Sequence, residues 1–117
     1  MSYNFKRALE DLQYEDLSTE RFLKAVIAEI ESNKITFDEI CIIEFTLVKI
    51  TNYYYLRVKY ATSHGRKYVM SRTYHDNKQK AELVFCEIKK KLKKEGFKIS
   101  EKEPDDEDVI KKLVIVF

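Results

Sequence analysis

The sequence predicts an α+β fold, in which a mostly antiparallel sheet of about five strands has one face covered by helices in the order ααβββαββ. Three stretches carry apolar residues at the helical spacing of three and four, whereas the stretches between and after them alternate with a period of two. The chain has 117 residues, the size of one ordinary domain. We therefore expect a single domain over residues 1–117.

Two helices are predicted before the first strand. The first, over residues 4–14, has four apolar residues on one side: Phe5, Ala8, Leu9 and Leu12. The second is expected to begin at Ser18, whose hydroxyl can accept a hydrogen bond from a free amide of the first turn, and to end near Asn33. Leu17 and Phe22 have the spacing of a hydrophobic staple around that start.

The next two segments form a hairpin with a definite register. A tight turn at Thr51 and Asn52 makes opposed positions sum to 103. One face then pairs Ile43 with Tyr60, Phe45 with Val58, and Leu47 with Leu56. The other pairs Glu44 with Lys59, Thr46 with Arg57, Val48 with Tyr55, and Ile50 with Tyr53. We expect the first face to be core and the second to be wet.

A second turn, at Ser63, His64 and Gly65, returns the chain as a third strand from Tyr68 to Tyr74. A two-residue loop would put this strand's even-numbered residues on the wet face, with Arg72 opposite Arg57. Met70 would then lie beside Lys59, and Tyr74 beside Tyr55. A bulge would reverse that parity.

A long helix and a last hairpin complete the predicted order. Asp76 or Asn77 is expected to cap the helix, and Gly96 to end it. The stripe that covers the sheet is Ala81, Val84, Phe85, Ile88 and Leu92. Residues 97–103 and 110–117 then pair around the acidic turn at 104–108.

From the second helix to Leu92, the α, β, β, β, α order resembles that of double-stranded RNA-binding domains, and NKQKAELVFCEIKKKL is similar to their last helix. Glu82 stands where that family has a phosphate-contacting lysine, Phe85 and Cys86 replace small alanines, and the glycine-rich loops are absent. The resemblance therefore implies a shared topology and carries over no site residue.

The positive charge is concentrated in one part of a nearly neutral chain. The net charge is +2, but residues 53–98 carry 13 Lys and Arg against 4 Asp and Glu. Residues 1–52 carry 6 against 10, and residues 99–117 carry 3 against 6. A basic segment of this kind can attract an anionic partner.

Candidates for catalysis or metal binding are few. His75 and Asp76 are adjacent, so in an extended chain they point in opposite directions, and a turn with a helix cap accounts for them better. His64 belongs to a loop tip, and Asp105, Asp106, Glu107 and Asp108 lack the alternating ligands and the glycine of a calcium loop. Cys41 and Cys86 are too far apart for paired zinc ligands and are expected to be buried free thiols. We expect no enzyme, no cofactor and no metal.

Binding is better supported, because tyrosines and cations share the predicted wet face. The candidate residues are Tyr53, Tyr55, Arg57, Lys59, Tyr68, Arg72 and Tyr74. Aromatic rings stack on the bases of single-stranded nucleic acid, and cations neutralise its phosphates. High β propensity of Tyr and solubility of an exposed sheet explain the same residues without a partner. Lys89, Lys90, Lys91, Lys93 and Lys94 are either a solvated helix end or a phosphate site.

The leading hypothesis is a small noncatalytic module that binds RNA or single-stranded DNA through this face. The alternative is a protein interaction module, such as an inhibitor or accessory protein of a virus or mobile element, or a homodimer joined through the same face. Acidic residues interrupt the first 17 positions, and no run of 18 apolar residues occurs. We expect a cytoplasmic protein with no membrane partner.

Overall fold

The computed structural model describes residues 2–102 and 108–117. The elements are α1 (Ser2–Asp11), α2 (Leu17–Ser32), a short 3-10 helix η1 (Phe37–Glu39), β1 (Ile40–Ile50), β2 (Tyr53–Thr62), β3 (Lys67–Thr73), α3 (Lys78–Lys94), β4 (Ile99–Lys102) and β5 (Val109–Val116). The predicted α+β class and order of helices and strands are confirmed. Of the predicted acidic turn, positions 104–107 lie outside the described residues.

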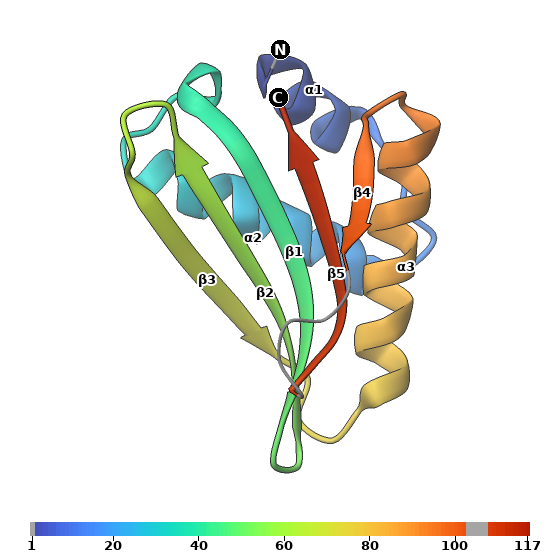
Figure 1. Cartoon of the computed structure of the whole chain (residues 1–117). Coiled ribbons are helices and arrows are strands. Elements are labelled where there is room, and N and C mark those ends of the chain that lie inside the picture. Colours follow the sequence, from blue (N-terminus) through green and yellow to red (C-terminus); the bar gives the residue numbers. More distant parts are fainter. Residues whose placement is uncertain (1, 103–107) are drawn as a thin grey trace.

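The five strands form one antiparallel sheet in the order β3-β2-β1-β5-β4. The helices lie on one side of it (Figure 1), where α3 packs against α2, β1, β2 and β4, and α1 packs against α2 and η1. One apolar core joins residues from all three helices to the inner face of the sheet. In the part of the chain that the structure describes, no helix covers the opposite face, which we call the open face.

The β1–β2 ladder has the predicted register at every predicted pair, from Ile43 with Tyr60 to Ile50 with Tyr53. Its inner face consists of buried apolar side chains: Ile43, Phe45, Leu47, Leu56, Val58 and Tyr60. The Asn33 side-chain amide donates a hydrogen bond of 2.8 Å to the Tyr60 hydroxyl, so the buried phenol has a partner at the end of α2. A bulge at Cys41 ends the regular pairing near the start of β1.

The β2–β3 register differs from the one that a two-residue loop would give. Opposed positions sum to 128, so Arg57 faces Ser71 and Leu56 faces Arg72. The Thr62 amide donates to the Arg66 carbonyl at 2.9 Å, which closes a loop of three residues, and Gly65 supplies the positive φ of 82°. The extra loop residue reverses the parity of the whole strand. Even-numbered residues of β3 therefore lie on the helix side of the sheet.

The helix ends need two corrections. The first helix, predicted over residues 4–14, spans Ser2–Asp11, so Leu12 lies beyond its end. Asn33 ends α2, Asn77 caps α3 by accepting from the Lys80 amide at 3.1 Å, and Gly96 follows α3 with φ of 91°. The start predicted at Ser18 is wrong, because Asp16 is the cap and its carboxylate accepts from the Ser18 amide at 2.8 Å. Leu17 is 57% exposed and so forms no staple.

The cysteines also depart from expectation. Both thiols are free, as predicted, but Cys41 is half-buried and Cys86 is exposed on α3. Cys86 falls outside the apolar stripe of α3, whose predicted members Ala81, Val84, Phe85, Ile88 and Leu92 are all buried.

Within residues 2–102 and 108–117, none of the helices has the length and apolar character needed to cross a lipid bilayer.

The observed cap of α2 gives a direct test. Asp16→Ala removes the carboxylate that satisfies a free amide of the first turn, and should lower the free energy of unfolding by about 1 kcal/mol. Ser18→Ala is the matched control and should change it by less than about 0.5 kcal/mol. Urea unfolding followed by circular dichroism measures both. A larger loss in the Ser18 variant would contradict the assigned cap.

Candidate binding face of the sheet

The open face is built from alternate residues of all five strands, since successive side chains of a strand point to opposite faces. Across the sheet these are Lys67, Val69, Ser71 and Thr73 of β3; Tyr53, Tyr55, Arg57, Lys59 and Ala61 of β2; Ile42, Glu44, Thr46, Val48 and Ile50 of β1; Val109, Lys112, Val114 and Val116 of β5; and Ser100 and Lys102 of β4. The face thus combines cations, tyrosines and aliphatic side chains.

The structure brings four of the seven predicted site residues together on this face. Tyr53, Tyr55, Arg57 and Lys59 follow one another along β2 at every second position, which spaces them by about 7 Å. Tyr53 and Lys59 are exposed, whereas Tyr55 and Arg57 are half-buried. The rings of Tyr53 and Tyr55 lie 6.5 Å apart and inclined by 56°, so their faces are not stacked on each other.

The other three predicted site residues, Tyr68, Arg72 and Tyr74, do not reach the open face. The ring of Tyr68 stacks on that of Tyr60 at 5.1 Å, and Arg72 lies 5.7 Å from the ring of Tyr74. Tyr74 is buried, and this burial raises the pKa of its phenol. The prediction that β3 extends the face through these residues and Met70 is wrong, because the three-residue loop reverses its parity.

Sequence reasoning missed the side chains that replace them. Lys67 and Val69 are the exposed β3 neighbours of Ala61 and Lys59, and Val69 is 57% exposed. Val116 of β5 is 67% exposed beside Ile42. For Lys67 and Val69 the signal is the β2–β3 turn itself, since a three-residue hairpin loop ending in glycine is a common type.

The centre of the open face is less exposed to solvent than the sequence predicted. Thr46 and Val48 of β1 are 3% and 2% exposed. Thr46 lies between Arg57 of β2 and Lys112 of β5 in the two ladders, and long side chains with apolar stems can cover a strand in this way. Among the described residues, the Thr46 hydroxyl has no hydrogen-bond partner. A buried polar atom therefore lies between two cationic positions of the ladders at the middle of the face.

Charge on this face is unbalanced. Its one acidic residue is Glu44, whose carboxylate forms an ion pair of 2.9 Å with Lys112. Arg57, Lys59 and Lys67 form no ion pair within residues 2–102 and 108–117. Lys102 stands directly opposite Lys112 in the β4–β5 ladder, where like charges repel. A bound anion on this face would reduce the repulsion between these cations.

The two histidines considered for catalysis lie at opposite ends of β3, in different loops. His64 is exposed at the tip of the β2–β3 loop, and His75 is exposed with its ring 5.4 Å from Tyr53 in an edge-on arrangement. The described part of the chain contains no group of three or more His, Cys, Asp or Glu side chains able to hold a metal ion. Asp105, Asp106 and Glu107 lie outside the described residues.

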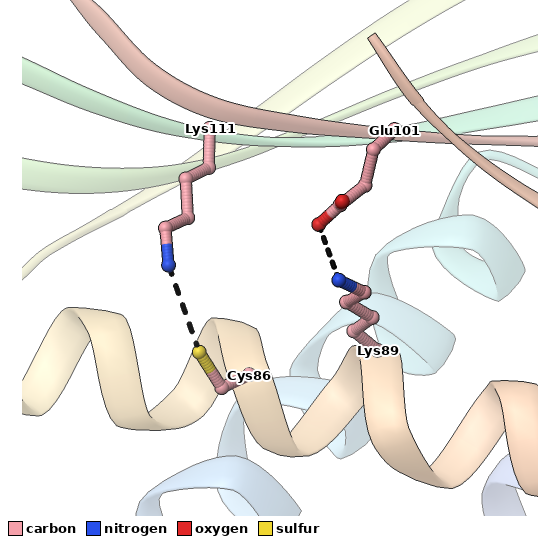
Figure 2. A network of polar contacts seen from close by, with 4 residues as sticks. All are labelled: Cys86, Lys89, Glu101 and Lys111. Carbon is pink, nitrogen blue, oxygen red and sulfur yellow. Dashed lines mark hydrogen bonds and ion pairs between the residues drawn. The ribbon is translucent and has the colours of Figure 1, made fainter.

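A second charged cluster joins α3 to the β4–β5 hairpin on the helix side of the sheet. Figure 2 shows Lys89 reaching Glu101 of β4, and Lys111 of β5 pointing toward Cys86. The Lys111 ammonium lies 3.9 Å from the Cys86 sulfur. This cluster and the rest of the Lys89–Lys94 segment belong to the layer of α3, so they do not continue the open face.

Comparison with protein-family models, with curated proteins and with solved structures finds no match to this chain.

The Lys89–Glu101 pair predicts how stability varies with pH. The hydrogen bond from Lys89, together with attraction to Lys93 and Lys111, holds the pKa of the Glu101 carboxyl below its ordinary value. A pKa lowered by folding stabilises the protein above the unfolded-state value, and this stabilisation disappears as pH falls through the folded-state value. Glu101→Gln should thus be slightly less stable than the native chain near neutral pH.

The same comparison at acidic pH supplies the control. As pH falls through the lowered pKa of Glu101, the native carboxyl becomes protonated, so the unfolding midpoints of the two proteins in urea should converge. Added salt should also reduce the difference at neutral pH, because the pair is exposed. A difference that grows on acidification would contradict this account of Glu101.

Proposed function

We propose that this protein is a small noncatalytic module that binds RNA or single-stranded DNA on the open face of its sheet. The observation that carries the proposal is the row of Tyr53, Tyr55, Arg57 and Lys59 along β2, on a face with no helix over it among the described residues. Each base that stacks on a tyrosine ring contributes about 1–3 kcal/mol, whatever its sequence. The cations beside the rings neutralise phosphates.

Lys67 joins this set in place of Arg72. It is exposed on β3 opposite Ala61, so it extends the cationic side of the face beyond Lys59. The proposed site therefore has two parts: the Tyr53 and Tyr55 rings toward the β1–β2 turn, and Arg57, Lys59 and Lys67 toward the β2–β3 loop. A single strand lying along β2 would contact both parts in succession.

The decisive test is the salt dependence of binding to a labelled single-stranded oligonucleotide, measured by fluorescence anisotropy. Removing one phosphate contact reduces the slope of log affinity against log salt by about 0.7 to 1. Arg57→Ala and Lys59→Ala should each reduce the slope by this amount. Tyr55→Ala should weaken binding by about 1–3 kcal/mol with the slope unchanged.

Arg72→Ala is the matched control, because Arg72 carries the same charge on the adjacent strand but lies on the helix side of the sheet. It should leave the slope unchanged. Equal effects of the Arg57 and Arg72 variants would show that the open face is not the site. Lack of measurable binding at low salt to both RNA and single-stranded DNA would reject the proposal.

A protein partner on the same face is the second candidate, and the aliphatic rim favours it. Val69, Val116 and Ile50 are among the exposed large apolar residues of the chain, and they offer neither charge nor a ring for stacking. Tyrosine, arginine and apolar side chains together are typical of protein interfaces. Arg57, Lys59 and Lys67 on this face would repel a second copy laid face to face, so this candidate partner is an acidic polypeptide.

The rim residues separate the two candidates. Val69→Ser and Val116→Ser should weaken a protein complex by about 1 kcal/mol each and leave oligonucleotide affinity unchanged. Recovery of bound material from the native source, before and after nuclease treatment, shows which class of partner is held. A partner that is lost after nuclease but retained by both valine variants supports nucleic acid and contradicts the protein candidate.

A further inference from the structure

Strand β3 is an edge strand, and among the described residues no further strand pairs with its outer side. It is seven residues long, is the terminal strand of the sheet, and pairs only with β2. The other edge strand, β4, has four residues. Long flat edges offer rows of free amide and carbonyl groups that pair readily with another strand, and natural edges are usually blocked by proline, bulges or charge.

The parity of the β2–β3 ladder identifies which groups are free. The Tyr74 amide donates to the Tyr54 carbonyl at 2.7 Å, and the Thr62 amide donates to the Arg66 carbonyl at 2.9 Å. Hydrogen-bonded residues alternate along an antiparallel strand, so the even-numbered residues of β3 bond to β2. The amides and carbonyls of Lys67, Val69, Ser71 and Thr73 therefore point away from the sheet, and all four residues are exposed.

We propose that this edge binds the β3 strand of a second copy of the chain, in antiparallel register centred on Met70. The outward groups of both copies can meet only if odd-numbered residues oppose odd-numbered ones. Centring on Met70 satisfies this condition and pairs Val69 with Ser71 of the second copy, and Lys67 with Thr73. Two five-stranded sheets then form one continuous sheet, with both open faces on the same side.

The side chains favour this register. The two cations of the strand, Lys67 and Arg72, are opposed by Thr73 and by Tyr68 of the second copy, so no like charges meet directly. Arg72 opposite Tyr68 adds a cation beside an aromatic ring. Face-to-face pairing of two copies, by contrast, would bring Arg57, Lys59 and Lys67 against the same residues. The edge is thus the part of this surface that is compatible with self-association.

The dimer contact uses the outward backbone groups of β3, whereas the nucleic-acid site uses side chains of the open face. Lys67 belongs to both, but dimer formation does not depend on bound nucleic acid. Its test is the molecular mass of the native chain over a range of concentrations, by sedimentation equilibrium without nucleic acid. A reversible dimer is expected. Ser71→Pro removes one outward amide from each copy and no bond to β2, and should weaken the dimer roughly 30-fold. Ser71→Thr keeps the amide and is the matched control.

A charge swap tests the register without proline. In V69K/S71K a lysine opposes a lysine of the second copy in two places, so the dimer should be lost. In V69K/S71E each lysine opposes a glutamate, so the dimer should return. Circular dichroism checks that each variant is folded. A native chain that stays monomeric at high concentration, or a dimer that withstands both S71P and V69K/S71K in folded form, would overturn the proposal.

Discussion

The structure depends on the antiparallel ladder between β1 and β2. β1 is the central strand, bonded to β2 on one side and to β5 on the other, so its register fixes the orientation of the remaining strands. Because side chains alternate with a period of two, a slip of one residue would exchange Leu56 and Val58 for Tyr55 and Arg57 in the core. Burying an arginine without a partner costs several kcal/mol, so the observed register is strongly selected.

The register of this ladder was predictable because the residue patterns on both faces of the sheet favour the same pairing. Pairing Phe45 with Val58 and Leu47 with Leu56 satisfies the core, while Glu44 with Lys59 and Thr46 with Arg57 satisfies the other face. A two-residue turn at Thr51 and Asn52 is the simplest closure that serves both. The turn places Thr51 at φ of 54°, an uncommon conformation for a β-branched residue, which shows that the ladder outweighs local preference there.

The register of β3 was less predictable, because the residues on its two faces differ little in character. Along β3, Tyr68, Met70, Arg72 and Tyr74 are each compatible with either face, because tyrosine and arginine are amphipathic. The alternate residues, among them Val69 and Ser71, give no stronger signal. Only the loop length decides between the two parities, and one extra loop residue reverses the parity. The burial of Thr46 and Val48 was missed because the alternation within β1 does not reveal how far the strands on either side of it exclude water.

That one loop residue determines the composition of the open face and the chemistry of the edge together. In an antiparallel edge strand, the residues whose backbone groups point outward all have their side chains on the same face. In β3 these residues are Lys67, Val69, Ser71 and Thr73, which all belong to the open face. The opposite parity would have placed two tyrosines and an arginine there and would have freed their backbones instead. A strand that adds to this edge therefore lies beside Lys67, Val69, Ser71 and Thr73, and it leaves Arg57 and Lys59 uncovered one strand away.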